Sequence, residues 1–156
     1  MIKVSDIYNF IDELAPFEYA KAGDDNVGLL VGDMDSQVNS VLLALDITNA
    51  VVAEAAKEGA QLVISHHPVI FDPLYSLQAT SPVYGLVKEG VAAICAHTNL
   101  DMAKGGISDI MAEMLMVTPC EVIEVVSQRV GEKIGFGKVC KLSTPHTPSQ
   151  LAKRVQ

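Results

Sequence analysis

The sequence predicts an α/β fold, a layered α/β sandwich with a mostly parallel sheet. Short runs of Val, Leu, Ile and Ala alternate with segments whose apolar residues recur at helical spacing. Strands that alternate with helices form βαβ units, and such units pair their strands in parallel. The chain has 156 residues and is 49% hydrophobic, so we expect a single α/β domain over residues 1–156.

The first predicted elements are a helix and two strands. The helix is expected to begin after Ser5 as its N-cap and to stop at Pro16, with apolar residues every three or four positions between them. VGLLVG at 27–32 predicts a short strand. SVLLALD at 40–46 is a continuous apolar run, which is typical of a strand that is buried on both faces.

The strand and helix pattern then repeats along the chain. Thr48 is expected to cap a helix that ends at Gly59, and QLVIS at 61–65 predicts the next strand. The later predicted elements are a helix from Pro82 to Gly90, a strand at 91–95, a helix from Ile107 to Met116, strands at 121–126 and 134–141, and a helix beginning at Pro148. The glycines in the strand at 134–141 predict an edge or bulged strand.

Composition excludes several classes of function. There are 19 acidic and 11 basic residues, a net charge of −8 and no block of Lys and Arg, so no nucleic-acid binding is expected. Three cysteines without a CxxC motif predict neither a disulfide framework nor a cysteine-rich zinc site. No segment resembles a secretory signal or a membrane span, so we expect a cytoplasmic protein.

The candidate site consists of polar residues that follow three successive predicted strands. Asp46 ends one strand, His66 and His67 follow the next, and His97 lies just beyond the third. The carboxyl ends of parallel strands meet at one edge of a sheet. Imidazole and carboxylate groups together bind divalent ions such as Zn, Mn, Fe or Ni, so a metal site is expected there. Taken singly, Asp46 could cap a turn and each histidine could be solvated.

The adjacent histidines favour a site with two ions. Neighbours in a strand point to opposite faces, and Pro68 restricts His67 to an extended conformation, so we expect the two rings to diverge. Asp101, in a predicted loop after His97, is the expected bridging carboxylate. Two ions would activate a shared water for hydrolysis. Asp25 and the residue that follows it form either a polar turn or part of the same crevice.

Several stretches together resemble one known family. They are DDNVGLLVG at 24–32, LALDIT at 43–48, LVISHHPVIF at 62–71, AHTNLD at 96–101 and IGFGKV at 134–139. In this order they resemble the GTP cyclohydrolase 1 type 2 homologues, also called Ngg-interacting-factor-like proteins.

The resemblance implies an α/β fold with a dinuclear metal centre. It implies that His66, His67 and Asp101 are metal ligands, that His97 lies in the same pocket, and that each subunit of the intact family site holds two divalent ions (Zn, Fe, Mn or Ni). It also implies a homohexameric ring. The family continues to a later HxxxE motif that supplies further ligands, and this chain has no such motif. We therefore expect the N-terminal portion of a longer fold, truncated relative to the family.

The expected function is that of a divalent-metal-dependent hydrolase of the GTP cyclohydrolase type 2-like family. It would act on a nucleotide-like substrate through a metal-bound water, with His97 as the catalytic proton shuttle. A plain phosphoesterase would differ only in its substrate. The alternative from another class is a non-enzymatic, metal-binding and ring-forming adaptor or scaffold protein.

Overall fold

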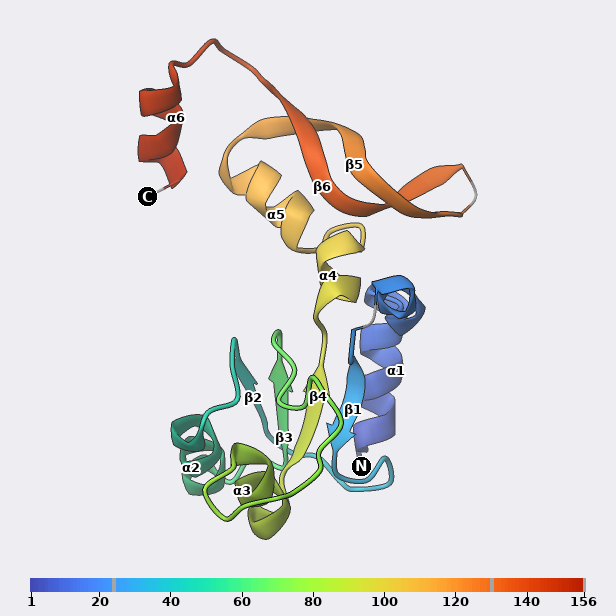
Figure 1. Ribbon diagram of the computed structural model, residues 1–156, viewed down its shortest axis with the longest axis vertical. Helices are drawn as coiled ribbons and strands as arrows, with labels where there is room; N and C mark the ends of the chain where they lie inside the picture. The colour runs from blue at the N-terminus through green and yellow to red at the C-terminus, as the bar shows by residue number, and fades with distance from the viewer. Residues whose placement is uncertain (24, 130, 156) are drawn as a thin grey trace. The chain divides into compact units, whose positions relative to one another are not determined.

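A computed structural model describes residues 1–23, 25–129 and 131–155 of the chain (Figure 1). They divide into two compact units, residues 1–99 and residues 100–156. The single domain expected over the whole chain stays a prediction.

The first unit is built on a four-stranded sheet with the strand order β1-β4-β3-β2. Strands β2, β3 and β4 are parallel to one another, and β1 pairs with β4 in the antiparallel direction. The strand bounds are Gly28–Val31 for β1, Val41–Ala44 for β2, Leu62–Ser65 for β3 and Ala92–Cys95 for β4. The predicted α/β class and the mostly parallel sheet are confirmed.

Helices connect the parallel strands, as the sequence predicts. The helices that begin in this unit are α1 (Val4–Leu14), a 3-10 helix (Phe17–Gly23), α2 (Asn49–Glu58), α3 (Pro82–Glu89) and α4 (Thr98–Met102). The backbone N–H of Val51 donates to the Thr48 side chain at 3.3 Å, so Thr48 is the N-cap of α2. Gly59 ends α2 in the left-handed conformation with φ 67°, as expected.

The predicted start of the first helix was wrong. Helix α1 begins at Val4, one residue before the expected cap Ser5. The N–H groups of Val4 and Ser5 donate to the carbonyls of Ser36 and Met34, each at 2.9 Å. Because backbone carbonyls already satisfy these first-turn donors, the helix needs no side-chain cap at Ser5.

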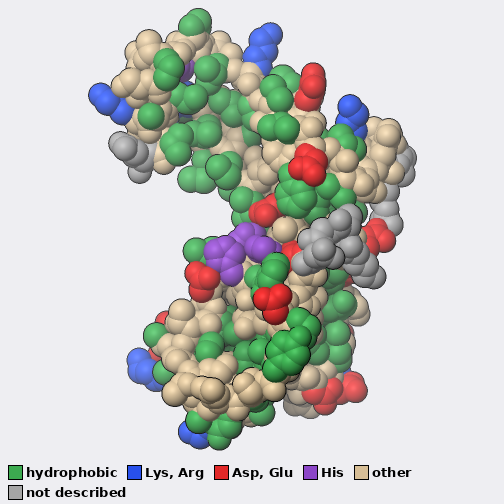
Figure 2. Space-filling view, viewed as in Figure 1, with side chains coloured by type: hydrophobic (Ala, Val, Ile, Leu, Met, Phe, Trp, Pro, Cys, Tyr) green, Lys and Arg blue, Asp and Glu red, His purple; other side chains and the backbone are tan. Residues whose placement is uncertain are grey.

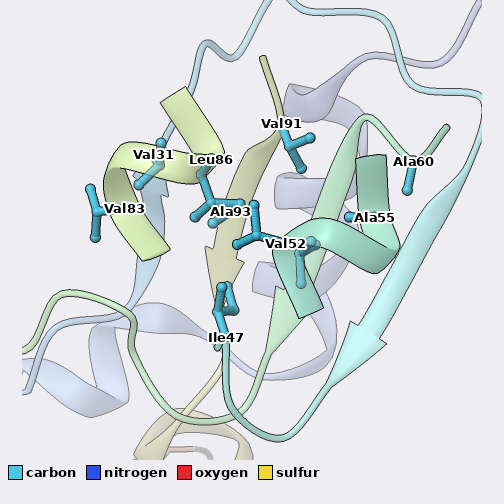
Figure 3. Packing of buried hydrophobic residues seen from close by; sticks show 10 residues of the cluster. Val31, Ile47, Val52, Ala55, Ala60, Val83, Leu86, Val91 and Ala93 are labelled. Atoms are coloured by element: carbon cyan, nitrogen blue, oxygen red, sulfur yellow. The ribbon is translucent and has the colours of Figure 1, made fainter. Parts of the chain in front are cut away.

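Two apolar clusters lie on opposite faces of the sheet. The buried members of the cluster under α2 and α3 are Val31, Ile47, Val52, Ala55, Ala60, Val63, Val83, Leu86, Val91 and Ala93 (Figure 3). Those of the cluster under α1 are Val4, Phe17, Val38, Leu62, Ala92 and Ile94. Successive residues of β3 and β4 therefore pack into opposite clusters. This packing anchors both strands and so positions the residues that follow them.

Strand β2 differs from the prediction because it lies at the edge of the sheet. Its Leu42 and Ala44 pack against the cluster under α2, but Leu43 on the other face is 73% exposed. The cluster under α1 draws its sheet residues from the other three strands, so nothing in it covers Leu43. The expectation that β2 is buried on both faces was wrong.

The second unit is an antiparallel hairpin with two helices. Its elements are α5 (Ile107–Met114), β5 (Val117–Arg129), β6 (Glu132–Leu142) and α6 (Pro148–Val155). The Lys138 Nζ lies 2.5 Å from Asp109 Oδ1 and ties β6 to α5. In a two-stranded sheet β6 is an edge strand, one of the two expectations for this glycine-containing segment. The bulges lie on β5 instead, because the register shifts place the extra residues there. Within the described ranges, no helix has the length and apolar character needed to cross a membrane.

Gly32 provides a test of the packing between β1 and β4. Its φ is 109°, and an added Cβ would lie 2.6 Å from the Ala92 Cβ. Gly59 also has a positive φ, but an added Cβ would meet nothing within 4 Å. Gly59→Ala adds only backbone strain of about 1–2 kcal/mol. Gly32→Ala adds an overpacking cost of about 1–3 kcal/mol to its strain.

We therefore expect Gly32→Ala to lower the free energy of unfolding more than Gly59→Ala does, as measured by urea denaturation. Equal losses for the two variants would contradict the close approach of the Gly32 backbone to β4.

Candidate metal centre

Three histidines converge at the carboxyl ends of β3 and β4. His66 and His67 follow β3 directly, and His97 lies two residues after β4. The parallel pairing of Ser65 with Cys95 places the two strand ends side by side. One ligand nitrogen from each histidine lies within 4.8 Å of those of the other two. Figure 2 shows histidine side chains gathered in one patch on the surface.

The two adjacent histidine rings lie together, which corrects the expectation that they diverge. Their centroids are 5.1 Å apart, and the centroid of His97 lies 5.1 Å from that of His66 and 5.7 Å from that of His67. The chain bends at His66 and His67, so the alternation of an extended strand no longer applies there.

Hydrogen bonds fix the backbone at this bend. Cys95 Sγ donates to the His66 carbonyl at 3.1 Å, and Ser65 Oγ donates to the His67 carbonyl at 2.8 Å. Burial raises the pKa of Cys95 to about 12, which keeps its thiol protonated and able to donate. Cys95 therefore helps to hold the bend in place, while the ligand atoms that converge belong to His66, His67 and His97.

The Nδ1 atoms of His66 and His67 face hydrogen-bond acceptors. His66 Nδ1 lies 3.0 Å from the Ala96 carbonyl oxygen, and His67 Nδ1 lies 2.7 Å from Asp46 Oδ1. A carbonyl oxygen or an ionised carboxylate can only accept, so each Nδ1 carries the proton and donates it.

His97 makes the corresponding contact with Asp25. Its Nδ1 lies 3.0 Å from both carboxylate oxygens of Asp25. Thr98 donates to the same carboxylate from Oγ1 at 2.5 Å and from its backbone N–H at 3.3 Å, and Asn26 N–H donates at 2.8 Å. Burial raises the pKa of Asp25, but the hydrogen bonds from Thr98, His97 and Asn26 outweigh burial and hold the pKa below its usual value. Asp25 is therefore ionised at neutral pH and His97 Nδ1 is the donor.

The arrangement fits a divalent metal ion. A neutral imidazole that donates from Nδ1 carries its lone pair on Nε2. Histidines that bind metals usually donate their other ring N–H to a carboxylate or a backbone carbonyl, which fixes the tautomer and the ring orientation. His66, His67 and His97 each have this second contact, so the three could hold a borderline ion such as Zn, Mn, Fe or Ni.

The remaining predicted site residues have different positions. Asp46 reaches the site through His67, as a partially exposed carboxylate, and thus does more than cap a turn. Asp101 lies on the short helix α4 rather than in the expected loop, and it belongs to the second unit. Its role as a bridging ligand stays a prediction. His97 lies in the same group as the two expected ligands, and its role as a proton shuttle also stays a prediction.

Some hydrogen-bond partners of the histidines were not predicted from the sequence. Asp25 was an alternative lining residue of the crevice, but its contact with His97, which lies 72 positions later in the chain, was not expected. Thr98 was also missed, and its position directly after His97 is the only local signal for its role. The Ala96 carbonyl that orients His66 has no signal in the sequence, because every residue carries a carbonyl.

The family model described as Duf34/NIF3 (NGG1p interacting factor 3) matches residues 2–156. A Clostridium perfringens protein named "GTP cyclohydrolase 1 type 2 homolog" is 33% identical over 159 aligned residues, which cover 99% of this chain and 60% of that protein. A Staphylococcus aureus protein of the same name is 40% identical over 119 residues, covering 73% of this chain and 32% of that protein. The chain thus spans about 60% or less of the length of these relatives.

Solved structures of related proteins superpose on this chain. A Bacillus cereus protein described as related to NIF3 superposes with a TM-score of 0.76 and 34% identity, over 81% of this chain and 36% of that one. A crystal structure of a Staphylococcus aureus protein gives a TM-score of 0.73 and 37% identity, over 80% of this chain and 41% of that one. Because the family model covers nearly the whole sequence, the chain belongs to the Duf34/NIF3 family.

Proposed function

We propose that this protein is a divalent-metal-dependent hydrolase that acts on a nucleotide-like substrate. One observation carries the proposal: three histidines converge and each donates from Nδ1, which leaves the lone pair of each neutral ring on Nε2. The name of the curated relatives, GTP cyclohydrolase 1 type 2 homolog, supports a purine nucleotide as the substrate class to test first.

The proposed roles of the three histidines follow from their contacts, while those of Asp101 and of a second ion rest on the family resemblance. His66 and His67 hold metal, Asp101 joins them as a further ligand, and the intact site takes two divalent ions. A bound divalent ion polarises substrate oxygens and lowers the pKa of water. His97 carries a proton to or from the substrate or serves as a third imidazole ligand; its contact with Asp25 suits both roles, because the carboxylate stabilises a positive charge on the ring.

The metal proposal can be tested with Zn²⁺ and single histidine variants. We expect His66→Ala to weaken Zn²⁺ binding by more than about 100-fold, because it removes an imidazole ligand, while loss of a supporting contact alone costs about 10–100-fold. The matched control is His146→Ala, which removes a partially buried histidine that contacts Thr144 and Arg154 in the second unit. Competition with a chromogenic chelator measures both affinities. Equal Zn²⁺ affinity of His66→Ala and the unsubstituted protein would contradict the proposed centre.

The hydrolase proposal can be tested by following GTP in the presence of Zn²⁺, Mn²⁺ or Fe²⁺. We expect metal-dependent turnover that a chelator abolishes, since the serine and cysteine described beside the histidines, Ser65 and Cys95, donate to backbone carbonyls rather than to an imidazole base. Chromatography of the products separates opening of the purine ring from release of phosphate and so distinguishes a cyclohydrolase from a phosphoesterase. Turnover at the same rate with and without chelator would overturn the proposal.

We also propose that the chain self-associates, in the hexameric ring that the resemblance implies. Support comes from the edge strand β2, on which Val41 and Leu43 are 38% and 73% exposed, and from Leu45 directly after it, which is 62% exposed. Exposed apolar edge strands are usually covered, because they otherwise pair with other chains. If no nucleotide is turned over, this association with bound metal favours the adaptor or scaffold function instead.

Substitution of Leu43 tests this association. We expect Leu43→Glu to lower the mass measured by light scattering, because a charge on the exposed face of β2 would have to be desolvated in an interface. Tyr75→Glu, at a loop residue that is 99% exposed, is the control and should leave the mass unchanged. An unchanged oligomer in Leu43→Glu would exclude this face from the interface.

A further inference from the structure

The antiparallel direction of β1 brings Asp25 and Asn26 to the histidines. β1 begins at Gly28, which pairs with Cys95 at the end of β4. The residues just before β1 therefore lie at the same edge of the sheet as the residues just after β4. A parallel β1 would place them at the opposite edge.

Asp25 is almost entirely enclosed by its hydrogen-bond donors. Its side chain is only 4% exposed, and its carboxylate accepts from His97 Nδ1, Thr98 Oγ1 and the backbone N–H groups of Thr98 and Asn26. A buried carboxylate is tolerated only when such donors surround it. Because both oxygens are held in this way, the carboxylate acts on His97 from a fixed position.

Asn26 makes a second connection, to the segment that follows His67. Its Nδ2 donates to the Ile70 carbonyl at 2.7 Å, three residues beyond His67. Two consecutive side chains thus contact the segments after both histidine-bearing strands: Asp25 contacts the one after β4, and Asn26 contacts the one after β3.

We propose that Asp25 and Asn26 are positioning residues for the histidine cluster. Asp25 holds the His97 ring with Nδ1 as donor and Nε2 turned to the centre of the cluster, and Asn26 holds the segment behind His67. A role of these residues in metal binding rests on the proposed function, whereas the positioning of the rings rests on the hydrogen bonds alone. Asp46 holds the His67 ring in the same way but less firmly, because the Asp46 side chain is 56% exposed and water competes for its oxygens.

The decisive experiment measures the tautomer of His97 in the metal-free protein. Long-range ¹H–¹⁵N correlation spectra, recorded at about pH 8, well above the ordinary imidazole pKa of about 6.5, distinguish a proton on Nδ1 from one on Nε2. We expect His97 in the unsubstituted protein to carry its proton on Nδ1.

Asp25→Ala removes both oxygens that accept from His97 Nδ1, so no side chain at this position holds the proton on that nitrogen. The proton of His97 should therefore move to Nε2. The matched control is Asp46→Ala, which should leave the His97 tautomer as it is. Retention of the Nδ1 proton on His97 in a folded Asp25→Ala protein would overturn the assignment of Asp25.

Zn²⁺ affinity supplies a second readout. We expect Asp25→Ala to weaken Zn²⁺ binding about 10–100-fold, the usual effect of removing a partner of a histidine ligand, and Asp46→Ala to weaken it less. Asn26→Ala should also weaken it, with altered signals from His67. Unchanged affinity in Asn26→Ala would remove Asn26 from the proposal.

Thr98→Val provides the test if Asp25→Ala does not fold. It removes one donor to Asp25 but keeps the carboxylate, so His97 should retain its Nδ1 proton while Zn²⁺ affinity falls by about threefold or more, less than for loss of the carboxylate. An affinity equal to that of the unsubstituted protein would contradict positioning through Asp25. If neither the unsubstituted protein nor any variant binds Zn²⁺, the proposed metal-dependent function is wrong. The tautomer of His97 still tests its positioning by Asp25 in that case.

Discussion

The donation of Nδ1–H from three histidines to fixed acceptors is the constraint on which the site depends. An imidazole in solution exchanges its proton between two nitrogens and rotates freely. Here a backbone carbonyl, an exposed carboxylate and a buried carboxylate remove that freedom from His66, His67 and His97, respectively. Each acceptor lies near the end of a strand of the sheet. Because the sheet holds these acceptors in place, their hydrogen bonds also fix the orientation of the imidazole rings.

The acceptors differ in strength, and burial explains the difference. Asp46 and His67 form a partially exposed pair, and such pairs contribute roughly 0–1 kcal/mol. Asp25 is 4% exposed, and loss of its donors would leave a buried charge, an effect that costs several kcal/mol in measured cases. A cation bound by the histidines would further offset the buried negative charge of Asp25. Of these two carboxylates, the more constrained one therefore lies behind His97.

Much of this arrangement could be predicted from the sequence. Apolar runs followed by Asp46, by His66 with His67, and by His97 predicted both the parallel sheet and the edge at which these residues meet. Thr48 and Gly59 predicted the ends of α2, because capping is a local property. The convergence of the adjacent histidines could not be predicted, since it depends on a bend held by Cys95 and Ser65, and only the folded chain brings Cys95 to His66.

The edge position of β2 and the antiparallel direction of β1 could not be predicted from the sequence, because both depend on how the strands pair in the sheet. An apolar run such as that at 40–46 is equally consistent with a central and an edge strand. The pairing of Asp25 with His97 follows only once β1 is known to run antiparallel to β4. Local propensities therefore located the elements, while long-range strand order determined which polar residues support the ligands.

Anomalous X-ray diffraction from crystals grown with Zn²⁺ shows whether the histidine cluster binds metal through Nε2. We expect zinc density about 2.0–2.1 Å from the Nε2 atoms of His66 and His67, and at the same distance from that of His97 where it serves as the third ligand rather than as the proton shuttle, with Asp25 and Asp46 still hydrogen-bonded to Nδ1. Zinc bound through Nδ1, or an absence of anomalous density at the histidine cluster at saturating Zn²⁺, would contradict this expectation.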